Sequence, residues 1–191
     1  MNRKIAFQVA VALQLVFLGW MVAAKERTIA TGLRVTLKVA PFDPNDYLSG
    51  RYLRITPAIA QIDPAKVEVV RGRESLASLA GRNAFVELTR DGDVWDATRV
   101  VVDGSGVTPR RPFLRARVEY SMDTALHLDY SFERFYIPAD GHDPSVFSSD
   151  RPHALVAVVR VPSDGAGVLE DLLVDGKPWK TWNAEEKAKE R

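Results

Sequence analysis

The hydrophobic and polar positions of this chain follow two different patterns. From Ile5 to Ala24, twenty residues carry no charge, and only Gln8 and Gln14 interrupt the apolar run. At a rise of about 1.5 Å per residue, a helix of this length just spans the hydrocarbon core of a bilayer, about 30 Å thick. Beyond Lys25 the pattern has a period of two, which indicates β-strands. The sequence therefore predicts an N-terminal membrane anchor, residues 1–24, and a β-rich domain behind it.

The flanks of the apolar run favour an anchor that is not cleaved. Trp20 lies near its outer end, where an amphipathic ring prefers the membrane interface. Cleavage after Ala24 is the alternative, because residues 22–24 are small, but the apolar core of a signal peptide is usually only about 7–15 residues long. Arg3 and Lys4 favour an N-terminus inside the cell. We expect a single-pass protein of the inner or plasma membrane, with its C-terminal domain extracytoplasmic (periplasmic).

Alternating apolar and polar residues, typical of half-buried strands, recur along the domain. They occur in Leu33–Val39, Leu114–Tyr120 and Leu126–Phe132. Two hairpins are also indicated, one by Asp-Gly within Arg90–Asp93 and one by the longer turn Pro162–Gly167, and Asp175-Gly176 turns the chain again. The strands that flank the hairpin turns are Ala84–Thr89, Val94–Val102, Ala154–Val161 and Val168–Val174. The predicted fold is mainly β, a single antiparallel β sandwich or partly open barrel behind one transmembrane helix.

Helical signals are scarce outside the anchor. Asp63-Pro64 has the residues of a helix N-terminus, and Glu74–Leu79 is suited to a turn or two of helix. No repeat or low-complexity linker divides the chain, so residues 30–182 are expected to form one extracytoplasmic β-rich domain. Residues 183–191 are almost all charged or alanine, and we expect a frayed, charged tail there.

Composition excludes several kinds of chemistry. The chain has no cysteine, which removes thiol catalysis, thiolate metal sites, disulfides and the acylated cysteine of a lipoprotein. Without Arg3 and Lys4, 24 basic residues remain against 25 acidic ones. This balance provides no polyanion-binding field, so we expect no nucleic-acid partner. His127, His142 and His153 share no metal-ligand spacing, and we expect neither a metal site nor a cofactor.

The segment between the first two predicted strands is the most unusual part of the chain. It contains Pro41, Pro44 and Gly50 among polar residues, which describes a rigid loop that leads into a strand from Arg51. The side-chain oxygens of this loop that could bind a hard cation such as calcium belong to Asp43, Asn45 and Asp46. Alternatively, these side chains accept hydrogen bonds from the loop's own backbone and cap its turns. Capping is the more frequent role of such residues. Tyr47 and Tyr52 form a recognition surface or pack the loop onto the sheet.

Three segments together carry a recognisable motif pattern. Asp43, Pro44 and Asp46 precede a motif in which Gly50 and Tyr52 are retained, Glu133–Pro138 reads Glu-Arg-Phe-Tyr-Ile-Pro, and Val158–Asp175 forms the last hairpin. In this order and spacing the chain resembles the membrane-anchored proteins named for a Gly-Asp-Tyr-x-x-Leu-x-Tyr motif. Arg51, Ile55 and Pro57 stand where that motif has Asp, Leu and Tyr. The residues at the family's motif positions are Gly50, Tyr52, Ile55, Glu133, Arg134, Tyr136 and Pro138.

The resemblance implies a single-pass anchor and an extracytoplasmic domain of unknown function, in a family often associated with multi-pass membrane proteins. We interpret the loop as the partner-contacting site, because only one strand separates it from the anchor and its restrained backbone loses little entropy on binding. The residues predicted to contact the partner are Asp43, Asp46, Tyr47, Gly50, Arg51 and Tyr52. The alternative is that Gly50 and Tyr52 only set the turn and pack the next strand. Glu133 and Arg134, as neighbours on a strand, are expected to face opposite ways and to pair across strands.

One enzymatic alternative has the same layout of anchor and β domain, the signal-peptidase-like Ser/Lys hydrolases. Ser121 and Lys177 superficially resemble their nucleophile and base. A general-base lysine must be desolvated, whereas Lys177 follows Asp175-Gly176 in an expected exposed turn. We therefore name no catalytic residue and expect a binding or accessory module for a membrane partner. A secreted ligand-binding domain, released by cleavage after Ala24, is the other alternative.

Overall fold

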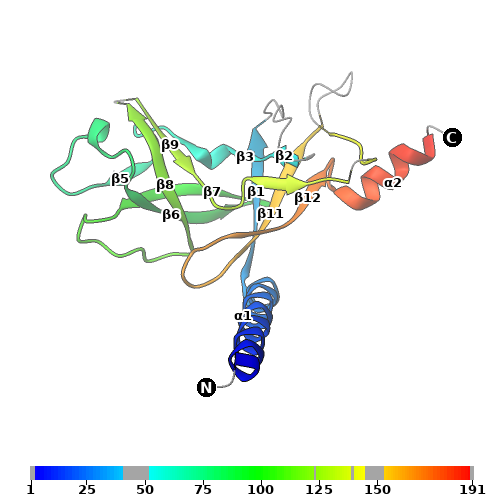
Figure 1. The fold of residues 1–191 in the computed structure, drawn as a ribbon. Helices are drawn as coiled ribbons and strands as arrows, with labels where there is room; N and C mark the ends of the chain where they lie inside the picture. Colours follow the sequence, from blue (N-terminus) through cyan, green and yellow to red (C-terminus); the bar gives the residue numbers. More distant parts are fainter. Residues whose placement is uncertain (1–2, 41–51, 123, 139, 145–152, 190–191) are drawn as a thin grey trace.

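The computed structural model describes residues 3–40, 52–122, 124–138, 140–144 and 153–189. Its longest element is the helix α1 (Arg3–Thr31), which projects from one side of a β-rich domain (Figure 1). The stretch of α1 best suited to cross a membrane is not buried against the domain at all. The chain thus has one N-terminal helix that is long and apolar enough to span a bilayer, as the sequence predicted.

α1 runs almost directly into the first strand, β1 (Leu33–Ala40). The single residue between them is Gly32, whose amide donates to the Thr28 carbonyl over 2.8 Å. Arg160 Nη1 donates to the Gly32 carbonyl oxygen over 3.3 Å. A Cβ atom on Gly32 would lie only 2.6 Å from the Thr28 oxygen, so this junction requires glycine. Helix and sheet are therefore joined without a flexible linker.

In the described part of the chain, the strands form two sheets and one two-stranded ribbon (Figure 1). The sheet orders are β13-β12-β11-β1-β3 and β4-β9-β8-β6-β7-β5, and the ribbon pairs β10 with β2. Two short 3-10 helices, η1 (Ala58–Ala60) and η2 (Leu76–Ser78), lie between strands. The strands after β1 are β2 (Tyr52–Arg54), β3 (Thr56–Pro57), β4 (Gln61–Ile62), β5 (Glu68–Val70), β6 (Asn83–Asp91), β7 (Val94–Val102), β8 (Phe113–Met122), β9 (Ala125–Asp129), β10 (Arg134–Tyr136), β11 (Leu155–Val161), β12 (Val168–Val174) and β13 (Lys177–Pro178).

Residues 52–62 connect all three groups of strands. Within this stretch, β2 pairs with β10, β3 with β1, and β4 with β9. The sheet consequently curls into a half-barrel, which confirms the predicted mainly β, partly open architecture. Pairing is antiparallel as predicted except between β5 and β7, which are parallel. That exception arises because the chain crosses from the β4 edge to the opposite edge of the sheet before β5 begins.

Both predicted hairpins are confirmed, as β6–β7 and β11–β12. The first closes with a two-residue turn in which Gly92 has a φ of +61°, a conformation that glycine adopts without strain. After β12, Asp175 and Gly176 have φ values of +50° and +81°. Positive φ at both central residues is the type I′ hairpin geometry, whose twist matches that of the strands.

The strands enclose a single hydrophobic core. The period of two places Val35 and Leu37 of β1, Val86 of β6 and Leu114 of β8 on the inner face, where they are completely buried. Side chains of β9, β11 and β12 join the same cluster. Burial of each such aliphatic side chain stabilises the fold by about 1.5–3 kcal/mol relative to its exposure.

The strand predicted at Leu126–Phe132 ends early, at Asp129. The Glu133 side chain accepts a hydrogen bond from the Tyr130 amide over 2.9 Å, which diverts that donor from a strand ladder. Tyr130 and Phe132 are nevertheless buried in the core, as their apolar pattern predicted. The alternation thus indicated burial correctly but could not show where the ladder stops.

The two helical signals in the middle of the chain do not produce α-helices. Asp63 forms a turn instead, in which its carboxylate accepts from the Ala65 amide over 2.9 Å. Its carbonyl accepts from the amides of Lys66 and Val67, both over 3.0 Å. In Glu74–Leu79 only the three residues of η2 are helical. Asp and Asn compete for the backbone in this way, which makes them good caps for turns as well as for helices.

The expected frayed tail at the C-terminus is wrong, because Trp179–Lys189 forms the helix α2. Trp179 and Trp182 bury this helix against the domain. Trp179 Nε1 donates to the His142 carbonyl over 3.3 Å, and the Trp182 ring meets His153 edge-on at 5.2 Å. Asn183 Oδ1 accepts from the His142 amide over 2.7 Å. Two buried tryptophans directly before residues 183–191 therefore order the start of this charged segment.

The packing of the turn between β11 and β12 against Phe113 of β8 can be tested by mutation. A Cβ atom on Gly165 (φ +76°) would lie 2.5 Å from Phe113 Cε2, whereas one on Gly92 would meet nothing within 4 Å. Both Gly165→Ala and Gly92→Ala carry left-handed backbone strain, but only the first overpacks. We expect Gly165→Ala to lower the free energy of unfolding by about 1–3 kcal/mol more than Gly92→Ala in urea titrations followed by tryptophan fluorescence. Equal losses would show that this turn is not packed on β8.

Candidate binding cleft

Two of the motif segments that the sequence singled out lie side by side in the ribbon of β2 and β10. Their register pairs Tyr52 with Tyr136, Leu53 with Phe135 and Arg54 with Arg134. Leu53 is buried and Phe135 packs edge-on against Trp179, with ring centroids 5.7 Å apart. Successive residues of a strand face opposite sides. The inner face of the ribbon is thus apolar, and its outer face carries two tyrosines and two arginines.

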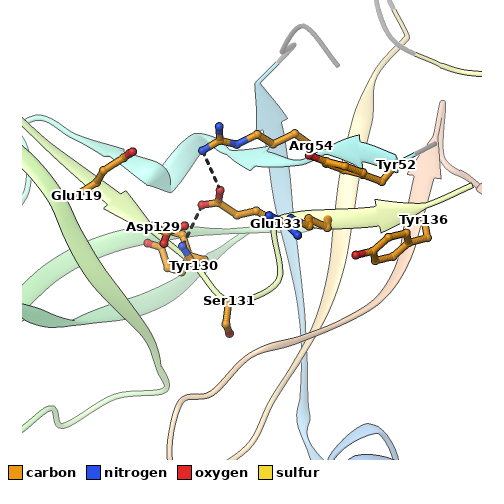
Figure 2. Close-up of a pocket in the computed structure, with 9 residues that line it drawn as sticks. Tyr52, Arg54, Glu119, Asp129, Tyr130, Ser131, Glu133 and Tyr136 are labelled. Carbon is orange, nitrogen blue, oxygen red and sulfur yellow. Dashed lines mark hydrogen bonds and ion pairs between the residues drawn. The ribbon is translucent and has the colours of Figure 1, made fainter. Parts of the chain in front are cut away.

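This outer face forms one wall of a cleft of about 660 Å³. Figure 2 shows Tyr52 and Tyr136 at one end, Glu119 and Asp129 toward the other, and Arg54 and Glu133 between them. The volume lies within the range of about 300–1,000 Å³ that is usual for small-molecule sites. The lining residues are Tyr52, Arg54, Glu119, Asp129, Tyr130, Ser131, Glu133, Arg134 and Tyr136.

Glu133 is the central charged group of the cleft and is only 9% exposed. Its Oε1 accepts from the Tyr130 amide over 2.9 Å, and its Oε2 lies 3.5 Å from Nη2 of Arg54. Its main-chain carbonyl accepts from the Ile55 amide over 2.7 Å. The Glu133 carbonyl therefore binds the Ile55 amide directly after β2, while the Glu133 carboxylate pairs with Arg54 at the end of β2. This ion pair holds the Arg54 guanidinium over the cleft (Figure 2).

Burial also sets the ionisation of this region. Removal from water raises the pKa of Glu133 above its usual value, and the neighbouring Asp129 charge raises it further. The Tyr130 amide and Arg54 oppose this increase because they stabilise the carboxylate. Burial, and then Glu133, raise the pKa of Tyr130 well above its usual value. The Tyr130 hydroxyl is therefore a neutral donor, and it donates to the Ile59 carbonyl over 3.1 Å.

The aromatic end of the cleft combines rings with a cation. The Tyr52 and Tyr136 rings are tilted to each other with centroids 5.9 Å apart. The Arg134 guanidinium carbon lies 5.3 Å from the Tyr52 ring centroid, in cation–π geometry. Tyr136 is 65% exposed, so its ring is available to a ligand. This arrangement suits a planar or ring-shaped group with polar substituents.

The structure changes the expectation for Glu133 and Arg134. Both pair across strands as predicted, Glu133 with Arg54 and Arg134 with Tyr52. They do not face opposite ways, however, since both line the same cleft. The alternation fails because Glu133 precedes β10 and belongs to the turn that its own carboxylate closes.

The remaining predicted residues lie in different parts of the structure or outside the part that it describes. Tyr52 lines the cleft, Ile55 is in the core at 1% exposure, and Pro138 accepts the Gly141 amide at a turn over 2.9 Å. The burial of Ile55 explains why an aliphatic side chain suits this motif position. The loop residues predicted to contact a partner, other than Tyr52, lie outside the residues that the structure describes: Asp43, Asp46, Tyr47, Gly50 and Arg51. The same holds for Asn45, which was considered as a cation ligand or a turn cap.

Several cleft residues were missed from the sequence. Arg54 was identifiable, because it lies two positions after Tyr52 on a strand and must share its face. Glu119, Asp129 and Ser131 carry no such signal, because they come from β8, β9 and the turn after β9. The curl of the sheet brings Glu119 near the ribbon, whereas Asp129 and Ser131 reach it through the turn that leads from β9 into β10.

Other residues considered from the sequence have separate structural roles. Ser121 Oγ donates to the Leu76 carbonyl over 2.5 Å, and Lys177 Nζ binds the Glu185 carboxylate at 2.7 and 2.9 Å. They do not form the hydrogen-bonded pair that a Ser/Lys hydrolase needs. His127 stacks on Tyr120, with ring centroids 4.0 Å apart. Within the described residues, no three His, Asp or Glu side chains gather as metal ligands would.

Comparison with known families assigns the chain to a class of proteins. The model of the family described as "GDYXXLXY protein" matches residues 14–172, from within α1 to β12. The match covers more than half of the chain, so this protein belongs to the GDYXXLXY family, as the motif segments predicted. Comparison with curated proteins gave no match, and neither did comparison with solved structures.

The pKa of Glu133 leads to a pH-dependent prediction. Because its folded-state pKa lies above the unfolded value near 4.5, its stabilising contribution is complete below that pH and is lost as the pH rises through the folded pKa. Glu133→Gln removes this titration but keeps an acceptor for Tyr130. We expect the unfolding free energy of the variant, relative to the wild type, to increase between pH 4.5 and neutrality in urea titrations. A difference that is constant with pH would contradict the raised pKa.

Proposed function

We propose that this chain is a membrane-anchored, extracytoplasmic binding module whose ligand occupies the cleft between β2, β10 and β9. The observation that carries this proposal is the buried Glu133 carboxylate, which pairs with the exposed Arg54 guanidinium in a cleft that also holds Tyr52 and the exposed ring of Tyr136. Burial of a charge costs stability unless partners compensate for it, and such groups concentrate at functional sites. A cleft with convergent polar groups and a perturbed carboxyl is the expected form of a ligand site.

The apolar surface of α1 supports the proposed location of the protein in a membrane. α1 presents large apolar side chains on all sides, for example Phe7 at 71%, Val16 at 70% and Trp20 at 67% exposure. A helix that is hydrophobic all round and unburied requires a lipid environment. Positive residues before the apolar run favour an inside N-terminus, which places the β domain on the outer side.

The rigid junction also defines where the cleft lies. α1 continues for seven residues beyond Ala24, about 10 Å of helix, and the eight residues of β1 add about 26 Å. β3 pairs with the far end of β1, and β2 immediately precedes β3. Along these two elements, the cleft therefore lies up to roughly 35 Å from the end of the apolar run. A ligand must reach that height, whether it is an external part of a membrane protein or a component of the cell envelope.

A membrane partner remains part of the proposal. Arg51 directly precedes Tyr52 in the sequence, and Tyr52 lines the aromatic end of the cleft. A partner that contacts the end of the Asp43–Arg51 segment therefore also reaches the cleft. A multi-pass membrane protein with an external domain of sufficient height satisfies this condition.

The topology can be tested with cysteine labelling, because the natural chain contains none. We expect Ala77→Cys, at an exposed position of the β domain, to react with a membrane-impermeant maleimide in intact spheroplasts. Asn2→Cys should react only after the membrane is permeabilised. The reverse labelling pattern would refute the orientation, and an intact mass lacking residues 1–24 would establish the secreted alternative.

The binding role can be tested by photo-crosslinking in cells. We expect p-benzoylphenylalanine at Tyr136, an aromatic replacement within the cleft, to capture a discrete species after irradiation. The matched control places the same group at Met122, which is 53% exposed on β8 and outside the cleft lining. Absence of any product specific to position 136 would refute the proposed binding site.

A further inference from the structure

The cleft is one half of a longer groove. A second hollow of about 390 Å³ adjoins it and shares Arg54, Glu119 and Glu133 as lining residues. The second hollow is also bounded by the stacked pair of Tyr120 and His127. The two hollows therefore adjoin at these shared side chains, and we treat them as one groove, with Tyr52 and Tyr136 at one end and Tyr120 and His127 at the other.

The distribution of exposed aromatic rings singles out this groove. Outside α1, the aromatic residues with large exposed side chains in the described domain are Tyr120, at 42%, and Tyr136, at 65%. Both line the groove, one at each end. One side of Tyr120 is covered by His127, whose ring lies 4.0 Å away and 18° from parallel. An exposed, supported ring is a preorganised stacking surface.

The floor between the rings is polar and its charges nearly balance. In the first hollow, the arginines Arg54 and Arg134 lie with the carboxylates of Glu119, Asp129 and Glu133. Planar guanidinium and carboxylate groups form two hydrogen bonds side by side. Neighbouring hydroxyls of a sugar ring present donors and acceptors with that spacing. The near balance of charge disfavours a strongly anionic or cationic polymer.

We propose that the groove binds a neutral glycan chain, with sugar rings stacked on Tyr136 and Tyr120 and hydroxyls bound by the charged groups between them. The C–H face of a sugar ring meets the negative face of an aromatic ring favourably. A peptide is less well matched, because peptide grooves take affinity from apolar pockets or from an added strand. This proposal rests on the binding function proposed above and names its ligand class.

The test uses the full chain in a detergent without a sugar headgroup, so that the detergent cannot occupy the groove. Cellotetraose, maltotetraose and chitotetraose are titrated by isothermal calorimetry. We expect at least one to bind saturably, and Tyr136→Ala and Tyr120→Ala each to weaken it about five- to tenfold, as the loss of one aromatic contact predicts. Tyr136→Phe should retain binding because it keeps the ring. Met122→Ala, exposed on the same strand as Tyr120, is the matched control.

Two results would overturn the glycan proposal while the binding function stands. One is no saturable binding of any tetrasaccharide, together with a protein captured from position 136 by photo-crosslinking. The other is a saccharide affinity unchanged in both alanine variants, with unchanged melting temperatures. If position 136 captures nothing and no tetrasaccharide binds, the glycan proposal and the proposed binding site both fail.

Discussion

The half-barrel depends on one continuous stretch of backbone, residues 52–62, that pairs in turn with β10, β1 and β9. Buried amides and carbonyls must find partners, and here one short segment supplies them to β1, which precedes it, and to β9 and β10, which lie far after it in the sequence. β3 lies at the edge of one sheet and β4 at the edge of the other, so this segment closes the curl of the fold. It also positions Arg54 and brings the β2–β10 ribbon to the mouth of the cleft.

Glu133 connects this backbone constraint to the chemistry of the cleft. Its carbonyl binds the Ile55 amide, while its carboxylate binds the Tyr130 amide and Arg54. The Arg54 side chain is 47% exposed, and an ion pair with an exposed partner contributes little to stability, so the Glu133–Arg54 pair is poorly explained by stability alone. It is better explained by the fixed orientation that it gives to Arg54. A local exception to the best packing of a core is expected where a protein binds its ligand.

The junction at Gly32 gives the cleft a defined place relative to α1. The Gly32 amide donates to the Thr28 carbonyl of α1, and the Gly32 carbonyl accepts a hydrogen bond from the Arg160 guanidinium of β11. A flexible linker would let the domain sample many orientations, whereas a helix joined to a strand by one residue restricts it. In our proposal this restriction presents the groove at a set height above the membrane, which lowers the entropy lost when a ligand fixed in the envelope is bound.

The sequence by itself determined the features that depend on local chemistry. Uncharged residues over the length of a bilayer indicated α1, the period of two indicated β1, β8 and the core residues, and Asp-Gly pairs indicated both tight turns. It also indicated the family, through motif segments that the family match confirmed. Each structural signal lies within about twenty neighbouring residues, and the family pattern depends on order along the chain, so no knowledge of distant contacts was needed.

Only the tertiary structure decided which motif residues meet. Arg54 and Arg134 are opposite each other although 80 positions separate them, and strand register between distant segments is set by the packing of the whole sheet. The same non-local packing converted the charged tail into α2, through Trp179 and Trp182, and ended β9 at Asp129. Glu119 and Asp129 look like ordinary surface carboxylates in the sequence. Asp129 lines the groove because a short turn leads from β9 into β10, and Glu119 does so because its strand, β8, pairs with β9.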